Sequence, residues 1–259
     1  METVMPATPS YPPQSAPRLY VETELSEGAN LRLEGSQAHY LLKVMRLAVG
    51  APVKLFDDLT GEYLAHVRSA GKRDIVLTID AKIREREDVP DLWLCAAPIK
   101  KDRYNWIAEK ATELGAAKLV PVITARTQHS QIKHDKLRIH MIEAAEQCER
   151  TALPILAPDI KIMELLEDWP ADRHLFFADE RIHQTGEGSF RKALVANAGP
   201  AAILIGPEGG FTDEENTAIR AFPHAVPVSL GPRILRADTA AVAAISLWMA
   251  GRGDWNPAS

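Results

Sequence analysis

Two short apolar runs, each followed by a glycine turn, lie near the end of this 259-residue chain and constrain its fold most strongly. The runs are Ala201–Ile205 and Ala225–Leu230, too short for typical helices and consistent with buried strands. Their turns read Gly-Pro-Glu-Gly-Gly over 206–210 and Gly231-Pro232. Ligands of α/β sheets bind at the carboxyl ends of strands, and glycine lets a backbone approach a ligand closely. We therefore expect both loops to form one ligand site.

Helix-start signals follow both turns, so each run belongs to a strand–loop–helix unit. They are Thr212 or Asp213 in the first unit and Asp238 or Thr239 in the second. Ordinary tight turns are the alternative interpretation of either loop alone. Neither loop matches GxxxxGK[ST] or GxGxxG, so the pattern does not indicate a nucleoside triphosphate site.

Arg236 is the candidate catalytic residue, because it is a lone cation just after the second glycine turn. A guanidinium beside a ligand loop can stabilise negative charge that develops during a reaction. The alternative role is a salt bridge to Glu208 or Asp238. Asp238 is expected to cap the final helix by accepting from its free N–H groups.

The pattern changes along the chain and predicts a tail and two domains. Residues 1–17 are rich in proline and serine and are expected to form a disordered tail. Residues 18–88 contain short alternating runs separated by Gly or Asp turns, with one helical insert over 36–47, which indicates a small β-barrel. A charged hinge over 84–90 marks the boundary. Residues 89–255 alternate strands and helices, which indicates an α/β domain with a largely parallel sheet.

Two groups of residues could face RNA. His39, Lys43 and Arg46 are the polar exceptions on the helical insert of the small domain, where a few cations would suffice to position a nucleic-acid backbone. A solvated helix face is an equally good explanation.

The second group surrounds a loop over 126–134 that is rich in basic, hydroxyl and amide side chains. It comprises Arg126 in this loop, and Gln147 and Arg150 in the helix that follows. A solvated loop is again the alternative.

Composition narrows the class of protein. The formal charge of −5 argues weakly against a highly basic coat for nucleic acid but permits a local basic patch. Eight histidines without HExxH or paired Cys/His spacing make a metal site unexpected. Cys95 and Cys148 form no CxxC and are expected to be two core or helix-packed thiols in a reducing compartment. Neither a signal peptide nor a run of about 20 apolar residues is visible, so we expect a soluble, cytoplasmic protein without a membrane partner.

The motifs at both glycine turns strongly resemble the RsmE family of ribosomal RNA methyltransferases, members of the SPOUT class. They read IGPEGGF and LGPRILRADTA, and HYLLKVMR, EKATELG and AAEQCER give further matches. The resemblance covers essentially the whole chain after the tail. Ala237-Asp238 stands where members often have Thr-Glu, and Glu149 where a small residue is common.

This resemblance implies an enzyme that uses S-adenosylmethionine to methylate N3 of uridine 1498 in the 16S rRNA of the small ribosomal subunit. It implies a PUA-like, RNA-binding barrel, a trefoil knot in the C-terminal domain and a homodimer. Arg236 would stabilise the deprotonated uracil, and Asp238, Glu146 or water could be the base. The cofactor would contact mainly the backbone of ten residues: Ala178, Ile205, Gly206, Glu208, Gly209, Gly210, Leu230, Gly231, Ile234 and Leu235.

Two other functions compete with this one. The first is a ribose 2′-O methyltransferase of the same class, although the motifs match RsmE over the full length. The second is a non-catalytic RNA-binding assembly factor that retains the fold, although the intact glycine loops and Arg236 argue against it.

Overall fold

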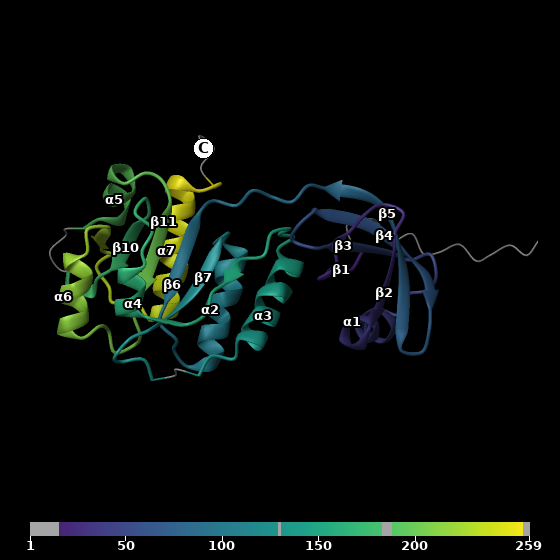
Figure 1. The fold of residues 1–259 in the computed structure, drawn as a ribbon, viewed down its shortest axis with the longest axis horizontal. Coiled ribbons are helices and arrows are strands. Elements are labelled where there is room, and N and C mark those ends of the chain that lie inside the picture. Colours follow the sequence, from purple (N-terminus) through teal and green to yellow (C-terminus); the bar gives the residue numbers. More distant parts are fainter. Residues whose placement is uncertain (1–15, 129–130, 183–187, 256–259) are drawn as a thin grey trace, which may run out of the picture. The chain divides into compact units, whose positions relative to one another are not determined.

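The computed structural model describes residues 16–128, 131–182 and 188–255, which form two compact units (Figure 1). The first unit extends to Asp88 and also contains Glu146–Ala152, whereas Val89–Ala145 and the residues from Leu153 form the second. The sequence-based ranges did not include this return of 146–152 to the first unit. The predicted tail lies almost wholly outside the described residues, but Ala16 is buried.

The first unit is a curled five-stranded sheet with the order β1-β3-β4-β5-β2. Strand β1 pairs in parallel with β3, and the remaining pairs are antiparallel. Alternate residues of β3, β4 and β5 form its core, including Val53, Val67 and Leu77, none of which is exposed. The strands are β1 (Arg18–Tyr20), β2 (Asn30–Glu34), β3 (Pro52–Phe56), β4 (Glu62–Ala70) and β5 (Asp74–Arg84).

The helical insert differs from the single helix expected over 36–47. It begins as α1 (Gly35–His39) and continues as the π-helix η2 (Tyr40–Val44). Its wider turn is visible in the hydrogen bond from Met45 N–H to the Tyr40 carbonyl, 2.9 Å long. Arg46 then adopts the left-handed conformation with φ 53° and ends the helix. Side-chain periodicity does not report such a change in backbone hydrogen bonding.

Asp57 anchors the loop after β3. Its carboxylate accepts from the backbone N–H groups of Leu25 (2.7 Å), Leu59 (2.9 Å) and Thr60 (2.7 Å), and from the Thr60 hydroxyl (2.6 Å). Burial alone would raise the pKa of Asp57, but the hydrogen bonds from Thr60, Leu25 and Leu59 outweigh it and lower the pKa. The carboxylate form therefore stabilises the folded unit.

We expect Asp57→Asn to destabilise the first unit by about 1.5–3 kcal/mol at neutral pH, because amide hydrogens would face N–H donors. A depressed pKa stabilises the protein above the unfolded value, and this contribution is lost as the pH falls through the folded value. The difference between wild type and variant should therefore shrink as the pH falls below 3.8. Hydrogen exchange of β3 and β4 measures it, and a difference independent of pH would contradict this assignment.

The second unit is built on a seven-stranded sheet with the order β12-β10-β11-β6-β7-β8, in which β9 also pairs with β7. Every pairing in this sheet is parallel, as the βα alternation predicts. The strands are β6 (Leu92–Ala96), β7 (Lys118–Ile123), β8 (Ile155–Leu156), β9 (Ile160–Lys161), β10 (His174–Ala178), β11 (Ala201–Ile205) and β12 (Ala225–Val228).

Helices cover both faces of this sheet. Successive residues of β11 point to opposite faces, so that Ile203 joins one buried cluster and Leu204 the other. The first cluster includes residues of α2 (Lys101–Glu113), α3 (His134–Gln147), α5 (Phe190–Ala196) and α7 (Ala237–Arg252). The second includes residues of α4 (Ile162–Glu167) and α6 (Asp213–Ala221). A sheet buried on both faces explains why its strands read as continuous apolar runs.

The two helices that follow the glycine turns begin differently. Thr212 caps α6 and forms a capping box with Glu215, in agreement with one of its two predicted starts. The N-cap of α7 is Arg236, without a side-chain hydrogen bond to the helix. The prediction of Asp238 as this cap is therefore wrong, because Asp238 already lies in the first turn of α7.

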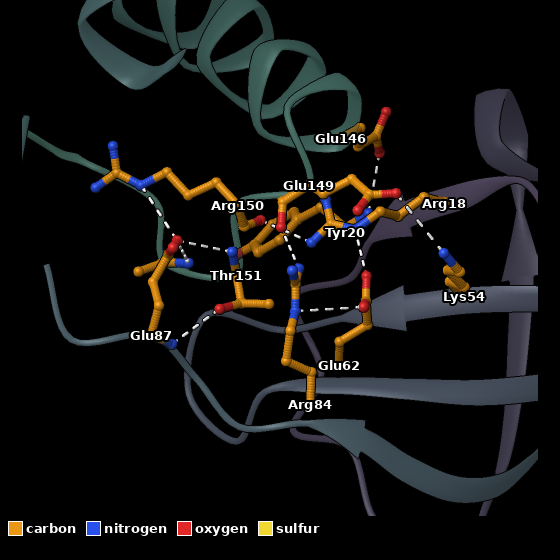
Figure 2. Close-up of polar contacts among 11 residues, drawn as sticks. Arg18, Tyr20, Lys54, Glu62, Arg84, Glu87, Glu146, Glu149, Arg150 and Thr151 are labelled. Carbon is orange, nitrogen blue, oxygen red and sulfur yellow. Dashed lines mark hydrogen bonds and ion pairs between the residues drawn. The ribbon is translucent and has the colours of Figure 1, made fainter. Parts of the chain in front are cut away.

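The segment Glu146–Ala152 is held in the first unit by a dense polar network (Figure 2). Arg18 donates to Glu62 and, at 2.7 Å, to the Arg150 carbonyl. Glu87 accepts from the backbone N–H of Thr151 at 2.9 Å and lies 3.5 Å from Arg150 Nε. The N-terminal unit is therefore completed by residues from the middle of the chain.

The cysteines lie in different environments. Cys95 is buried in β6, and burial raises the pKa of its thiol to about 12. Cys148 is exposed, contrary to the expectation of two packed thiols. Within the described ranges, no helix is long and apolar enough to cross a membrane.

Candidate functional site

A cavity of about 410 Å³ opens at the carboxyl ends of β10, β11 and β12, three neighbouring strands of the second unit. Its walls are the segments that follow these strands and the first turn of α7. A volume of this size suits a small-molecule ligand. The predicted convergence of the two glycine loops is therefore present, and a third loop, after β10, adds a wall.

Nine of the ten residues named for cofactor binding line this cavity, namely Ala178, Ile205, Gly206, Glu208, Gly210, Leu230, Gly231, Ile234 and Leu235. Gly209 does not line it. Its carbonyl instead accepts a hydrogen bond of 2.8 Å from Arg126, one of the residues predicted to face RNA.

Backbone conformation explains why glycine occupies two of these positions. Gly231 has φ 113°, a conformation that residues with side chains rarely adopt. Gly206 has an ordinary φ, but an added Cβ would lie 2.7 Å from the ring of Phe211. Gly231 is therefore required by the backbone conformation of its turn, whereas Gly206 is required because the Phe211 ring packs closely against it.

The wall after β10 carries charged side chains of both signs, including Arg181, and was not predicted beyond Ala178. It contains Asp179 and Glu180, which follow the strand directly. Asp179 is buried, accepts from the Arg181 N–H at 2.9 Å and forms an ion pair with Arg220. The rule that ligand groups follow strand ends could have found these two carboxylates.

Arg236 lies at the exposed edge of the same cavity. Within the described part of the chain it makes no ion pair with Glu208 or Asp238, which was the alternative role considered for it. Both carboxylates instead pair with Arg103 of α2. The hydrogen bond from Arg103 holds the pKa of Asp238 below its usual value.

The residues predicted to face RNA are distributed over both units. His39, Lys43 and Arg46 are exposed on α1, on η2 and just after it. Arg126 is exposed in the second unit, and Gln147 is exposed at the end of α3.

Arg150 was predicted to face RNA, but the structure buries it. Only 5% of it is exposed, and its guanidinium faces Glu87 rather than solvent. A basic side chain with this burial and this partner does not reach an RNA phosphate.

The two carboxylates considered as bases already accept hydrogen bonds. Asp238 accepts from Arg103 at 2.7 Å, and Glu146 accepts from the Tyr20 N–H at 2.9 Å within the first unit. No group of three metal-ligating side chains occurs among the residues that the structure describes.

Comparisons with known proteins identify the family. Residues 85–249 match the model of an RNA methyltransferase domain, and residues 33–80 match an RNA methyltransferase PUA domain. The ribosomal RNA small subunit methyltransferase E of Rickettsia conorii is 32% identical over 88% of this chain and 93% of its own length. The chain belongs to the ribosomal RNA small subunit methyltransferase E family.

Solved structures support this membership of the methyltransferase E family. A Legionella pneumophila protein described as a methyltransferase, in complex with S-adenosylmethionine, is 29% identical, has a TM-score of 0.82 and covers 92% of this chain and 99% of its own. The methyltransferase E of Neisseria gonorrhoeae, bound to S-adenosylmethionine, is 26% identical with a TM-score of 0.77 and covers 93% and 100%. The family resemblance read from the two glycine motifs is confirmed.

Proposed function

We propose that this member of the methyltransferase E family transfers the methyl group of S-adenosylmethionine to N3 of a uridine in 16S rRNA, at the position of uridine 1498. The observation that carries the proposal is the cavity at the ends of β10, β11 and β12, with Arg236 at its edge and paired with neither Glu208 nor Asp238. Two solved relatives bind this cofactor according to their descriptions.

The residues around the cavity fit this cofactor. The glycine loops expose backbone amides and carbonyls, which suit adenine and ribose, and apolar side chains such as Leu230 and Leu235 complete the lining. The carboxylate of Glu180 suits a ligand that carries an ammonium and a sulfonium group. When bound, S-adenosylmethionine supplies the electrophilic methyl group.

Arg236 acts on the nucleobase. Uracil N3 carries a proton and becomes a good nucleophile only when the proton is lost, which places negative charge on the ring. A guanidinium without a competing carboxylate can stabilise that charge. The N-terminus of α7, whose N-cap is Arg236, adds a positive partial charge on the same side. The base remains open among Asp238, Glu146 and water.

Exposed basic and polar side chains outside the cavity would bind the RNA backbone. We assign this role to His39, Lys43 and Arg46 in the first unit and to Arg126 and Gln147. Phosphate contacts make affinity fall as salt rises, so RNA binding should weaken with ionic strength. The homodimer, the trefoil knot and the cytoplasmic location implied by the family belong to the same proposal.

Incubation of the purified protein with S-adenosylmethionine and 16S rRNA or small subunits tests the reaction, with nucleoside mass spectrometry as the readout. The proposal predicts 3-methyluridine. A 2′-O-methylated nucleoside would establish the ribose methyltransferase instead. Binding of RNA without any methylated product on either substrate would favour the assembly factor.

Gly231→Ala tests the cavity without adding bulk to it, since an added Cβ would have nothing within 4 Å. An alanine in the conformation at φ 113° should cost about 1–3 kcal/mol. We expect the free loop to relax away from this conformation, so that cofactor binding has to restore it and weakens by roughly 5–150-fold. Isothermal titration with S-adenosylmethionine measures the loss. Gly199→Ala is the matched control, because Gly199 has φ 104° and an equally open site but does not line the cavity. Equal cofactor affinity in both variants would contradict the assignment.

A further inference from the structure

Arg103 connects three elements of the second unit beside the cavity. It lies in the first turn of α2 and does not line the cavity itself. Its Nε donates to Asp238 Oδ2 at 2.7 Å, in the first turn of α7, and its Nη1 pairs with Glu208 in the loop after β11. One guanidinium therefore pairs with two carboxylates, one from the loop after β11 and one from the start of α7.

These two carboxylates are the natural competitors for Arg236. Glu208 lines the same cavity as Arg236, and Asp238 follows it by two residues in the chain. Each pairs with Arg103 in the structure, whereas Arg236 pairs with neither. An arginine that is already paired with a carboxylate has less charge to offer a developing anion, because the carboxylate compensates it.

We infer that Arg103 keeps Arg236 available for the nucleobase by neutralising Glu208 and Asp238, and that it is a positioning residue for methyl transfer. This inference rests on the proposed function. It explains how Arg236 pairs with neither acid although Glu208 lines the same cavity and Asp238 follows Arg236 by two residues. Arg103 acts through these acids and touches neither the nucleobase nor the cofactor.

Loss of Arg103 would release both acids. They would then be free to pair with Arg236 or to repel the anion that forms on the uracil ring. Both effects lower the methylation rate more than cofactor affinity. A purely structural role, in which Arg103 only holds the loop after β11 and the first turn of α7 together, predicts a different pattern: a lysine, which keeps the charge but lacks the planar fork that bridges both acids, would not restore the rate.

A charge-rescue series separates these roles. Arg103→Met, Arg103→Gln and Arg103→Lys are made with Glu208 and Asp238 kept, because Glu208 lines the cavity and Asp238 is a candidate base. Methylation of 16S rRNA at saturating cofactor is measured for each protein, with cofactor affinity by titration. Lys110→Met is the matched control, because Lys110 lies on the same helix and pairs with Glu113 at 2.6 Å, away from both loops.

We expect Arg103→Met and Arg103→Gln to lower the methylation rate at least tenfold, roughly, and Arg103→Lys to lower it less than about threefold. Lys110→Met should leave the rate unchanged. An equal loss in the lysine and methionine variants, or no loss in any of the three, would overturn the inference. Thermal unfolding is measured for every variant. If Arg103→Met unfolds, Arg103→Gln alone serves as the neutral variant.

Failure of this inference is distinguishable from failure of the proposed function. If the wild type forms no 3-methyluridine, the function itself is wrong. If the wild type forms it and Arg236→Ala does not, but Arg103→Lys loses as much activity as Arg103→Met, only the role of Arg103 is wrong.

Discussion

Replacement of Arg236 by alanine is expected to lower the rate of 16S rRNA methylation by about 10²–10³-fold, the usual cost of removing one group that stabilises a developing anion. Its side chain is exposed at the edge of the cavity and has no carboxylate partner in the described chain, so its loss leaves no buried charge behind. The affinity for S-adenosylmethionine should therefore change by less than about threefold, because contacts made only in the transition state affect rate and not binding.

Arg191→Ala is the matched control for this experiment. Arg191 is an exposed arginine of α5 in the same unit that does not line the cavity. It should methylate at the wild-type rate. Arg236→Lys should recover part of the activity, since it keeps the charge without the planar guanidinium. Near wild-type methylation by Arg236→Ala would remove Arg236 from the mechanism.

The second large effect is expected on stability, at the buried ion pair between Arg18 and Glu62 (Figure 2). Both side chains are more than nine-tenths buried, and Arg18 also lies over the Phe56 ring at 3.8 Å. Burial lowers the pKa of Arg18, and Glu62 opposes this shift. Glu62→Gln would leave the guanidinium buried without its counter-charge, which costs about 3–5 kcal/mol.

Hydrogen exchange in β1 and β4 is the appropriate measurement for this loss. All five tryptophans lie in the second unit, so tryptophan fluorescence does not report on the first unit. Glu34→Gln is the matched control in the same unit: Glu34 is 67% exposed and pairs with Arg32, and such pairs contribute roughly 0–1 kcal/mol. Equal protection in both variants would show that the buried pair contributes little.

The sequence predicts much of the second unit because its strands and helices have strong local signals. Ala201–Ile205 is apolar throughout and ends at glycines, and it forms β11 with the predicted bounds. The carboxyl-end rule then places the loop residues at one cavity. This reasoning works because parallel strands share a direction and therefore share an edge.

Features that depend on tertiary contacts were not predicted, because local sequence patterns do not report contacts between residues that are distant in the chain. Arg103 looks like any helical arginine until α2 packs beside the two loops, and nothing near it in sequence points to Asp238. Arg150 looks like a solvent-facing cation, yet the return of 146–152 to the first unit buries it against Glu87. The π-helix η2 was missed because the same apolar spacing fits an α-helix.

The central claim, methylation of uridine N3, is tested most directly by nucleoside mass spectrometry of 16S rRNA from cells that lack this gene. The account predicts that 3-methyluridine disappears, returns on complementation with the wild type and does not return with Arg236→Ala. Persistence of 3-methyluridine in the deletion strain would contradict it, because another enzyme would then make this modification.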